Sequence, residues 1–419
     1  MPERRKKAAA SGEDRISTLP DALLLHTLSL LPSDEAVQTC VLARQWRNLW
    51  TYTPSLRLIH EVDVDSDDED DVDVDKPRFS SAEHFNKFVS HLIVLRDRSP
   101  LVNCEIELYP FYPYPFNPNV PRTPTQAVQL WIQYALACQV RLLNIIDNCG
   151  DQRLLLNVPF ISSYLMTLHL QNVTLESSMD FSSCLVLENL EITYCNIFMH
   201  KISSKSLKRL CIAYGYFRTE VRTRISVPGI LSLHLEDGHV RTPVLENMPL
   251  LETAFVRLEE RCLDQCDNGD GNCDQESCDG CYGFHVLLIL LQFVQYIFRR
   301  DVARCPIFGR LKTLVLSDWC AAVDMEYSLV RVLQRSPILE KLTLKIRNDR
   351  NAIGVEGNHV PAELSFVCTQ LKVANIECQE LDGKVLKIWN ILRTCGVHPE
   401  KISIKIKHAG FYLFKFDGL

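Results

Sequence analysis

The chain has 419 residues, 47% of them hydrophobic and 23% charged, a composition that excludes a largely disordered or membrane-embedded protein. Residues 61–75 hold ten acidic residues and no basic one, so removing these ten from the net charge of −7 leaves +3 for the rest of the chain. A folded part this close to neutral has no strongly basic surface for nucleic acid, and its length allows two to three domains.

The N-terminal segment, residues 1–13, is predicted to be a disordered basic tail. Its basic residues, Arg4, Arg5, Lys6 and Lys7, could alternatively serve nuclear import, but no apolar stretch follows them, so the segment is not a signal peptide. Most of the seventeen cysteines stand singly in apolar runs and are expected to be reduced, buried thiols. The most apolar window, residues 284–298, is shorter than the ~20 residues that span a bilayer. We expect a protein of the nucleus, the cytoplasm or both, without a membrane partner.

Residues 14–59 are predicted to form three short helices. Thr18 is a suitable N-cap for the first helix, and Pro20 falls in its first turn, where a missing N–H costs nothing. Leucines 24, 28 and 31 then repeat on one helical face. Pro32 ends this helix, and Ser33 can cap the second. Apolar positions continue along the second and third helices at Val37, Cys40, Val41, Trp46, Leu49 and Trp50. A unit of about 45 residues cannot bury all of these side chains, which suggests a partner.

This segment closely resembles the F-box of plant proteins. The residues that match the usual F-box pattern are Asp14, Arg15, Ile16, Ser17, Leu19, Pro20, Asp21, Leu31, Pro32, Ala36, Val37, Thr39, Val41, Leu42, Trp46, Arg47, Leu49 and Trp50. The sequence departs from the pattern at Thr27, Ala43 and Gln45, which could weaken contact with a partner without changing the fold. The resemblance implies docking onto the Skp-type adaptor of a cullin-based ubiquitin ligase. The adaptor-binding residues expected from it are Leu19, Pro20, Leu24, Leu28, Leu31, Pro32, Val41, Leu42, Trp46 and Trp50.

Two irregular segments follow. Residues 60–80 are interpreted as an acidic linker, because blocks of like charge repel each other and stay open. Residues 109–124 hold six prolines with interleaved aromatic residues. We interpret this stretch as a surface loop packed on the main domain, with a polyproline II ligand for a small domain as the alternative.

A leucine pattern, apolar-x-x-apolar-x-apolar, recurs nine times between residues 140 and 376. It begins at positions 140, 165, 187, 207, 230, 251, 311, 339 and 371, and the first six copies are spaced within or near the 20–29 residues of leucine-rich repeats. One such strand can bury its inward side chains only when it is stacked on neighbours, so residues 81–360 are predicted to form a curved solenoid. Cys195 stands where this repeat uses Asn or Cys to bond loop backbone.

Strand alternation sends every second side chain of these repeats to the outer sheet face. Outward positions with residue types suited to reading a protein target are Glu191, Arg209, His234, Glu236, Phe255 and Arg257. The remaining segment, residues 361–419, resembles the FBD module of plant F-box/leucine-rich-repeat proteins, here as a strand, a helix around 385–392 and a final strand. Such a module would cap the exposed end of the solenoid. The whole chain thus resembles an α/β protein with an F-box, leucine-rich repeats and an FBD-like cap.

A group of metal-ligand candidates lies in a Cys-rich insert, residues 258–283. Its cysteines are Cys262, Cys266, Cys273, Cys278 and Cys281, and only the last two have the spacing of a zinc knuckle. A flexible reduced loop is expected, with structural zinc as the alternative. No catalytic motif or cofactor site is found. The sequence therefore predicts a non-catalytic substrate-recognition subunit that binds the adaptor and, through it, a cullin, together with an unknown target protein. The alternative is a leucine-rich-repeat scaffold protein acting outside a ligase.

Overall fold

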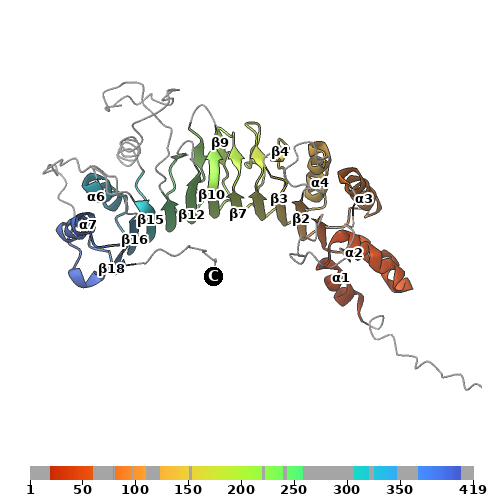
Figure 1. Ribbon diagram of the computed structural model, residues 1–419, viewed down its shortest axis with the longest axis horizontal. Helices are drawn as coiled ribbons and strands as arrows, with labels where there is room; N and C mark the ends of the chain where they lie inside the picture. Colours follow the sequence, from red (N-terminus) through yellow and green to blue (C-terminus); the bar gives the residue numbers. More distant parts are fainter. Residues whose placement is uncertain are drawn as a thin grey trace, which may run out of the picture. The chain divides into compact units, whose positions relative to one another are not determined.

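The computed structural model describes residues 19–59, 79, 81–96, 98–109, 123–150, 153–218, 222–238, 243–257, 306–319, 325–346 and 367–406. Figure 1 shows the ribbon of the chain. The chain divides into two compact units. The first comprises Met1–Asn144 and Asn148–Gly150, and the second comprises Ile145–Asp147 and Asp151–Leu419. The basic tail, most of the acidic linker, most of the proline-rich stretch and the Cys-rich insert lie outside the described residues.

The first unit begins with a helical module made of α1 (Asp21–Ser29), α2 (Ser33–Gln38) and the 3-10 turns η1 (Thr39–Val41) and η2 (Arg44–Tyr52). The third predicted helix is therefore a 3-10 segment rather than an α-helix. Pro20 and Pro32 occupy the N-cap positions of α1 and α2, because a fixed φ suits a helix start. Ser33 was expected to cap α2, but Pro32 holds the N-cap position and Ser33 is the first residue of the helix, where its hydroxyl oxygen accepts the backbone N–H of Arg57.

The rest of the first unit combines strands and helices. The strands β1 (Ser55–Ile59) and β2 (Asn103–Leu108) pair in parallel, from Ser55 opposite Asn103 to Ile59 opposite Glu107. The helices α3 (Ala82–Leu95) and α4 (Thr125–Ala137) bury Phe85 and Trp131, whose rings meet edge to face with centroids 5.7 Å apart. Strand β3 (Leu142–Asp147) begins in this unit. The last residues of the predicted F-box thus form a sheet strand.

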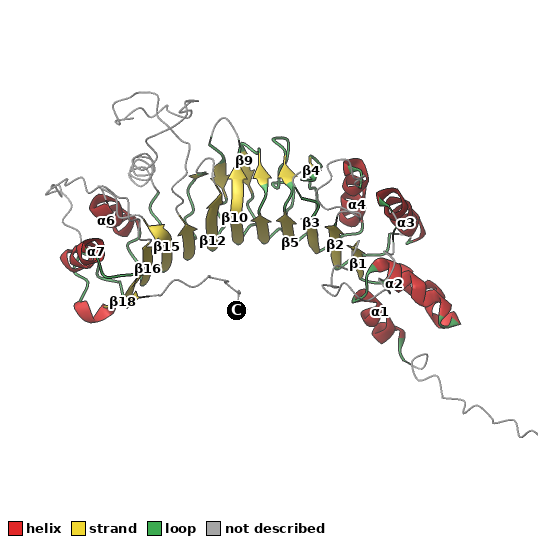
Figure 2. Ribbon diagram, in the orientation of Figure 1, coloured by secondary structure: helices red, strands yellow, loops and turns green. Residues whose placement is uncertain are grey.

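The second unit is built on one large parallel sheet, in which neighbouring strands follow each other in chain order (Figure 2). In order, its strands are β5 (Thr167–Gln171), β7 (Asn189–Thr193), β10 (Arg209–Phe217), β12 (Ser232–Gly238), β14 (Thr253–Arg257), β15 (Thr313–Trp319), β16 (Lys341–Ile346), β17 (Val373–Cys378) and β18 (Ile402–Ile406). Although residues 258–312 separate β14 from β15 in the chain, these strands are paired neighbours. The α/β class and the large parallel sheet that the leucine pattern predicts are therefore confirmed.

Short strands and helices complete the second unit. The strands β4 (Leu155–Leu156), β6 (Thr174–Leu175) and β8 (Asn196–Ile197) pair in series with the end of β10. A separate parallel sheet contains β9 (Lys201–Ser203), β11 (Arg224–Ser226) and β13 (Val244–Leu245). The helices are α6 (Met325–Arg335), α7 (Gly383–Thr394) and the 3-10 turn η4 (Pro399–Lys401). Both α-helices lie near the β15–β18 end of the sheet (Figure 2).

The core of the sheet is a set of stacked rows of inward side chains. One row runs in register through Leu168, Leu190, Leu210, Leu233, Ala254, Leu314, Leu342 and Ala374, all of them buried. The row is the fourth position of the leucine pattern, and stacking is what removes it from water. The thiol of Cys195 lies 3.4 Å from the Leu170 carbonyl oxygen, so this side chain bonds backbone as its position predicted.

The C-terminal elements match the expected order of strand, helix and strand. Strand β17 leads into α7, whose N-cap Asp382 accepts the backbone N–H groups of Lys384 and Val385. Gly396 follows the helix at φ +80°, a left-handed conformation that favours glycine. Strand β18 then pairs with β17. Among the described residues, no helix has the length and apolar character needed to cross a membrane.

Candidate protein-binding surfaces

The helical module has an inner apolar set that fills its core. Leu24 and Leu28 on α1 are each 1% exposed, and Trp46 and Trp50 on η2 are also buried. These four residues were expected to contact an adaptor directly. In the structure these side chains fill the core of the module, and their contact with an adaptor stays a prediction. They hold the module together.

The module also has an outer apolar set that faces water. Val41 is 82% exposed and Leu42 is 69% exposed, Leu19 is 39% exposed, and Pro20 is also exposed. Leu31 and Pro32 are half-buried. The structure adds Leu23, Leu30 and Tyr52 to the exposed residues. Helical periodicity predicts one apolar face, formed by residues 24, 28 and 31. Leu23 and Leu30 do not lie on that face, so periodicity did not predict them as exposed apolar residues.

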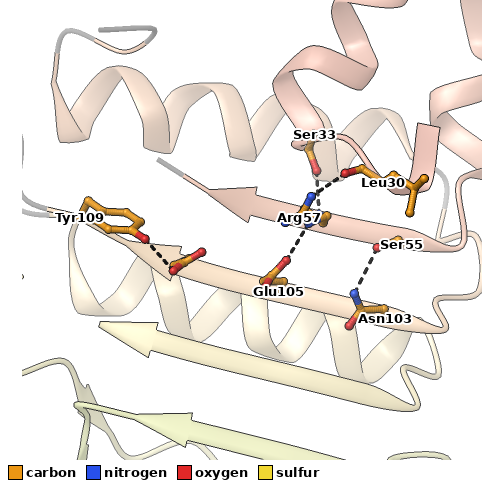
Figure 3. Close-up of polar contacts among 8 residues, drawn as sticks. Leu30, Ser33, Ser55, Arg57, Asn103, Glu105 and Tyr109 are labelled. Atoms are coloured by element: carbon orange, nitrogen blue, oxygen red, sulfur yellow. Dashed lines mark hydrogen bonds and ion pairs between the residues drawn. The ribbon is translucent and has the colours of Figure 1, made fainter. Parts of the chain in front are cut away.

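Arg57 on β1 ties the turn between α1 and α2 to the strands of the first unit (Figure 3). Its Nη1 donates to the Leu30 carbonyl oxygen at 2.5 Å, and its Nε donates to the Glu105 carboxylate on β2 at 2.7 Å. Its backbone N–H reaches the Ser33 hydroxyl at 3.0 Å. Figure 3 shows these contacts converging beside Leu30. The backbone that carries the exposed Leu30 side chain is therefore held by a charged group.

A second arginine, Arg96, fixes the other end of the module from within the core. It follows α3 and is only 1% exposed. Its Nη1 donates to the Thr53 hydroxyl at 2.7 Å and to the Trp50 carbonyl oxygen at 3.2 Å, while its Nη2 donates to the Thr53 carbonyl oxygen at 2.8 Å. These three hydrogen bonds satisfy part of the buried guanidinium, whose Nε has no hydrogen-bond partner among the described residues. No sequence pattern predicted this contact, because it joins residues more than forty positions apart.

On the sheet of the second unit, the register brings together four of the six predicted target-binding residues. His234 lies opposite Phe255, and Glu236 lies opposite Arg257. The rings of His234 and Phe255 are stacked with centroids 4.2 Å apart. Glu191 and Arg209 lie apart from this group. Glu191 is 3.7 Å from His169, and the Nε of Arg209 donates to the Asn189 side-chain oxygen.

Glu236 is the electrostatic centre of this group. Its carboxylate lies 2.5 Å from Nη1 of Arg257 and 3.3 Å from Nε2 of His234. Burial raises the pKa of Glu236, but hydrogen bonds from His234, Tyr214 and Arg257 outweigh burial and bring the pKa to about 2. The carboxylate is therefore ionised throughout the physiological range. Its contacts hold side chains of three strands in fixed positions.

Two tyrosines next to this group were not predicted. Tyr194 and Tyr214 both have a left-handed backbone, with φ of +55° and +54°. This conformation is unusual for bulky residues and is commonest where a structure enforces it. Their rings stack with centroids 4.7 Å apart, and Tyr194 remains 42% exposed.

Three outward positions of the sheet are buried although strand alternation predicts that they face water. These positions are Ala213, Ser317 and Thr343, whose short side chains lie below their longer neighbours.

The described thiols show no sign of nucleophilic chemistry. Burial raises the pKa values of Cys104, Cys195 and Cys211 to about 12, so these groups are protonated at neutral pH. Within the described ranges, no cluster of three or more His, Cys, Asp or Glu side chains could hold a metal ion. The Cys-rich insert lies outside those ranges.

No family model matches the chain, but comparison with curated proteins finds plant relatives. A putative F-box/FBD/LRR-repeat protein of Arabidopsis thaliana is 31% identical over 52% of this chain and 49% of its own length. Another Arabidopsis F-box/FBD/LRR-repeat protein is 29% identical over 56% of this chain and 50% of its own length. In these two relatives the match spans about half of the protein. A third, also named an F-box/FBD/LRR-repeat protein, is 24% identical over 86% of this chain and 83% of its own length. The resemblance read from the sequence is therefore confirmed, and the chain is a homologue of the plant F-box/FBD/LRR-repeat proteins.

Proposed function

We propose that this protein is the non-catalytic substrate-recognition subunit of an SCF-type cullin ubiquitin ligase. Residues 14–59 dock onto a Skp-type adaptor, which connects the protein to the cullin. The outer face of the parallel sheet binds a target protein. The names of the relatives support an F-box role, since they identify F-box proteins and none identifies an enzyme.

The observation that carries this proposal is the division of apolar side chains in the helical module. Leu24, Leu28, Trp46 and Trp50 already fill the core, yet Val41 and Leu42 remain 82% and 69% exposed. Burying an aliphatic side chain of this size contributes about 1.5–3 kcal/mol. A partner that covers both residues would therefore gain a large part of its binding free energy from them.

The sheet of the second unit supports the target-binding part of the proposal. Its in-register strands place outward side chains in rows, so residues far apart in the chain form one surface. On β12 and β14, that surface offers two stacked rings and a charged pair. Aromatic and arginine side chains are the types most often found as interface hot spots. The target-binding residues proposed here are His234, Glu236, Phe255 and Arg257, together with Glu191 on β7 and Arg209 on β10.

The experiment is a titration of purified full-length protein with a purified plant Skp-type adaptor. We expect Val41→Asp combined with Leu42→Asp to weaken binding by at least 100-fold, because a charge cannot be buried without a partner. Leu185→Asp is the matched control, since Leu185 is 67% exposed but lies in the second unit. This control should bind like the wild type. A wild-type protein that does not bind the adaptor would contradict the ligase proposal and leave the scaffold alternative.

A further inference from the structure

Helix α7 has an inner face that completes the core and an outer face that is exposed to water. The inner residues are all buried: Val385, Ile388, Ile391 and Leu392. The outer face follows from helical spacing, because residues three, four and seven positions apart lie on the same side of a helix. Starting from Leu386, that spacing reaches Trp389 and Arg393. Leu386 and Arg393 are exposed, and Trp389 is half-buried.

The apolar part of this outer face begins at the start of the helix. Leu381 directly precedes the N-cap Asp382, and Leu386 is the fourth residue of the helix. These are the positions of a hydrophobic staple, in which two apolar side chains pack against each other. Leu381 nevertheless remains 59% exposed, and Leu386 remains 56% exposed. A single exposed leucine is ordinary, but two leucines beside a tryptophan form an apolar patch that a partner can bury.

The outer face is also positively charged. Helix α7 contains two lysines and one arginine and no acidic residue. The guanidinium carbon of Arg393 lies 4.8 Å from the centroid of the Trp389 ring, so attraction between cation and ring holds this arginine in place. Within the described ranges, the side chains of Lys387 and Arg393 form no ion pair. The carboxylates of Glu380 and Asp382 lie before the helix, and Asp382 accepts two backbone N–H groups as its N-cap.

The charges and the apolar side chains together indicate the chemistry of a partner. Two cations without an anionic partner favour a segment that carries carboxylates. The exposed leucines and Trp389 favour apolar side chains on that segment, spaced so that they pack against a helix surface. Arg393 is already held against a ring, and its planar guanidinium can donate two N–H groups to one carboxylate. An acidic amphipathic helix meets all of these requirements.

A membrane surface fits the outer face of α7 less well. A helix that lies on a bilayer buries a broad apolar face in the lipid. On α7 that broad face lies in the core, where its four apolar residues are buried. Between Leu386 and Arg393, the outer face also carries the polar residues Lys387 and Asn390. These observations favour a protein segment over a lipid surface.

We propose that the outer face of α7 binds an acidic amphipathic helix of a partner protein. The residues of this face are Leu381, Leu386, Lys387, Trp389 and Arg393. The leucines and the tryptophan cover the apolar side of the partner helix, and the two cations pair with carboxylates along its edges. None of these residues belongs to the helical module or to the outward positions of the sheet strands. The inference therefore goes beyond the proposed function and does not depend on it.

The test measures binding of synthetic peptides to the full-length protein by fluorescence anisotropy. The probe is a fluorescein-labelled helical peptide, about four turns long, with leucines on one face and glutamates elsewhere. This peptide should bind saturably and at least tenfold more tightly than two control peptides. One control has lysine in place of glutamate, and the other has the same composition with its leucines spread around the helix. Equal binding of either control peptide would overturn the proposal.

Charge reversal and truncation on α7 locate the binding surface. Lys387→Glu combined with Arg393→Glu should reverse the preference, so that the lysine peptide binds more tightly than the glutamate peptide. Leu386→Ala should weaken binding of the glutamate peptide about tenfold, the scale of a hot-spot residue. Leu130→Ala is the matched control, because Leu130 is 63% exposed on α4 in the first unit. This control should bind like the wild type. Wild-type binding by Leu386→Ala and an unchanged preference after charge reversal would overturn the proposal.

Two further measurements test the other possible occupants of this face. Co-sedimentation with vesicles of phosphatidylserine and phosphatidylcholine should be absent or insensitive to the charge reversal. Vesicle binding that is lost in the charge-reversal variant, without binding of the glutamate peptide, would assign the face to a membrane. Sedimentation should show the same oligomeric state for the wild type and Leu386→Ala, and a dimer lost in this variant would assign the face to a second copy. Adaptor binding should be the same in all of these variants, so failure here is distinguishable from failure of the ligase proposal.

Discussion

The helical module of the first unit and the parallel sheet of the second unit bury their apolar side chains in different ways. The sheet repeats one strand pattern, so each inward leucine is covered by the strands beside it. The module has no repeated neighbour, and Val41 and Leu42 remain in water after its core is filled. A repeated element can complete its own core, whereas a single small module keeps apolar surface for a partner. Under the proposed function, the two regions therefore bind different partners.

The first prediction tests the stacked core and has the largest expected effect. Leu233→Ala removes a side chain that is 2% exposed and packed in the central row of the sheet. We expect a loss of about 2–5 kcal/mol in unfolding free energy, because the cavity cannot close between regular strands. Thermal and denaturant unfolding would measure this loss. Leu185→Ala, at a 67% exposed position, is the control and should change stability by less than about 0.5 kcal/mol. Equal losses from the two variants would contradict the assignment of the core.

The second prediction concerns the module and its attachment to β1. Arg57→Ala removes the donors to the Leu30 carbonyl oxygen and to Glu105. Hydrogen bonds to charged groups contribute about 1.5–3 kcal/mol, so we expect a loss within this range in the stability of the first unit. Adaptor affinity should also fall, because the turn that carries Leu30 loses its support. Arg57→Lys keeps the charge but loses the planar set of guanidinium N–H donors. The stability of this variant should lie between that of the wild type and that of Arg57→Ala. Hydrogen exchange of the α1 and α2 amides would show whether the loss is local.

The sequence predicted the sheet far better than it predicted the surfaces. The nine leucine patterns all coincide with strands, since burial by stacked neighbours imposes the same inward positions in every repeat. The contacts of Arg57 and Arg96 were not predictable, because they join positions more than twenty residues apart and follow no period. The F-box resemblance assigned Leu24 and Leu28 to adaptor binding, and the structure buries both in the core of the module. Periodicity identifies an apolar face but does not say whether the chain or a partner covers it.

The third prediction uses pH to test the charged group on β12 and β14. The pKa of Glu236 is about 2 in the folded chain and 4.5 without its partners. Because the folded value is the lower one, the stabilisation is fully present above pH 4.5 and is lost as the pH falls from 4.5 towards 2. We expect this group to contribute on the order of 1 kcal/mol, since solvent screens part of it. Glu236→Gln should make unfolding less dependent on pH over this range. If Glu236→Gln left the pH dependence of the unfolding free energy unchanged, the contacts of the Glu236 carboxylate with His234 and Arg257 would not stabilise the fold.

The last prediction concerns ion pairs at the beginning of the sheet strands and has the smallest expected effect. Glu188 and Lys208 form one such pair on neighbouring strands, at 2.5 Å, and Glu340 and Lys372 form another at 2.9 Å. These side chains are a third or more exposed, so water and salt screen their attraction. Lys208→Ala should therefore change stability by less than about 1 kcal/mol, and the change should shrink further in 1 M salt. Unfolding curves at low and high salt would measure the change in stability and its dependence on salt. A loss as large as that of Leu233→Ala would mean that charge, rather than the stacked leucines, holds the strands in register.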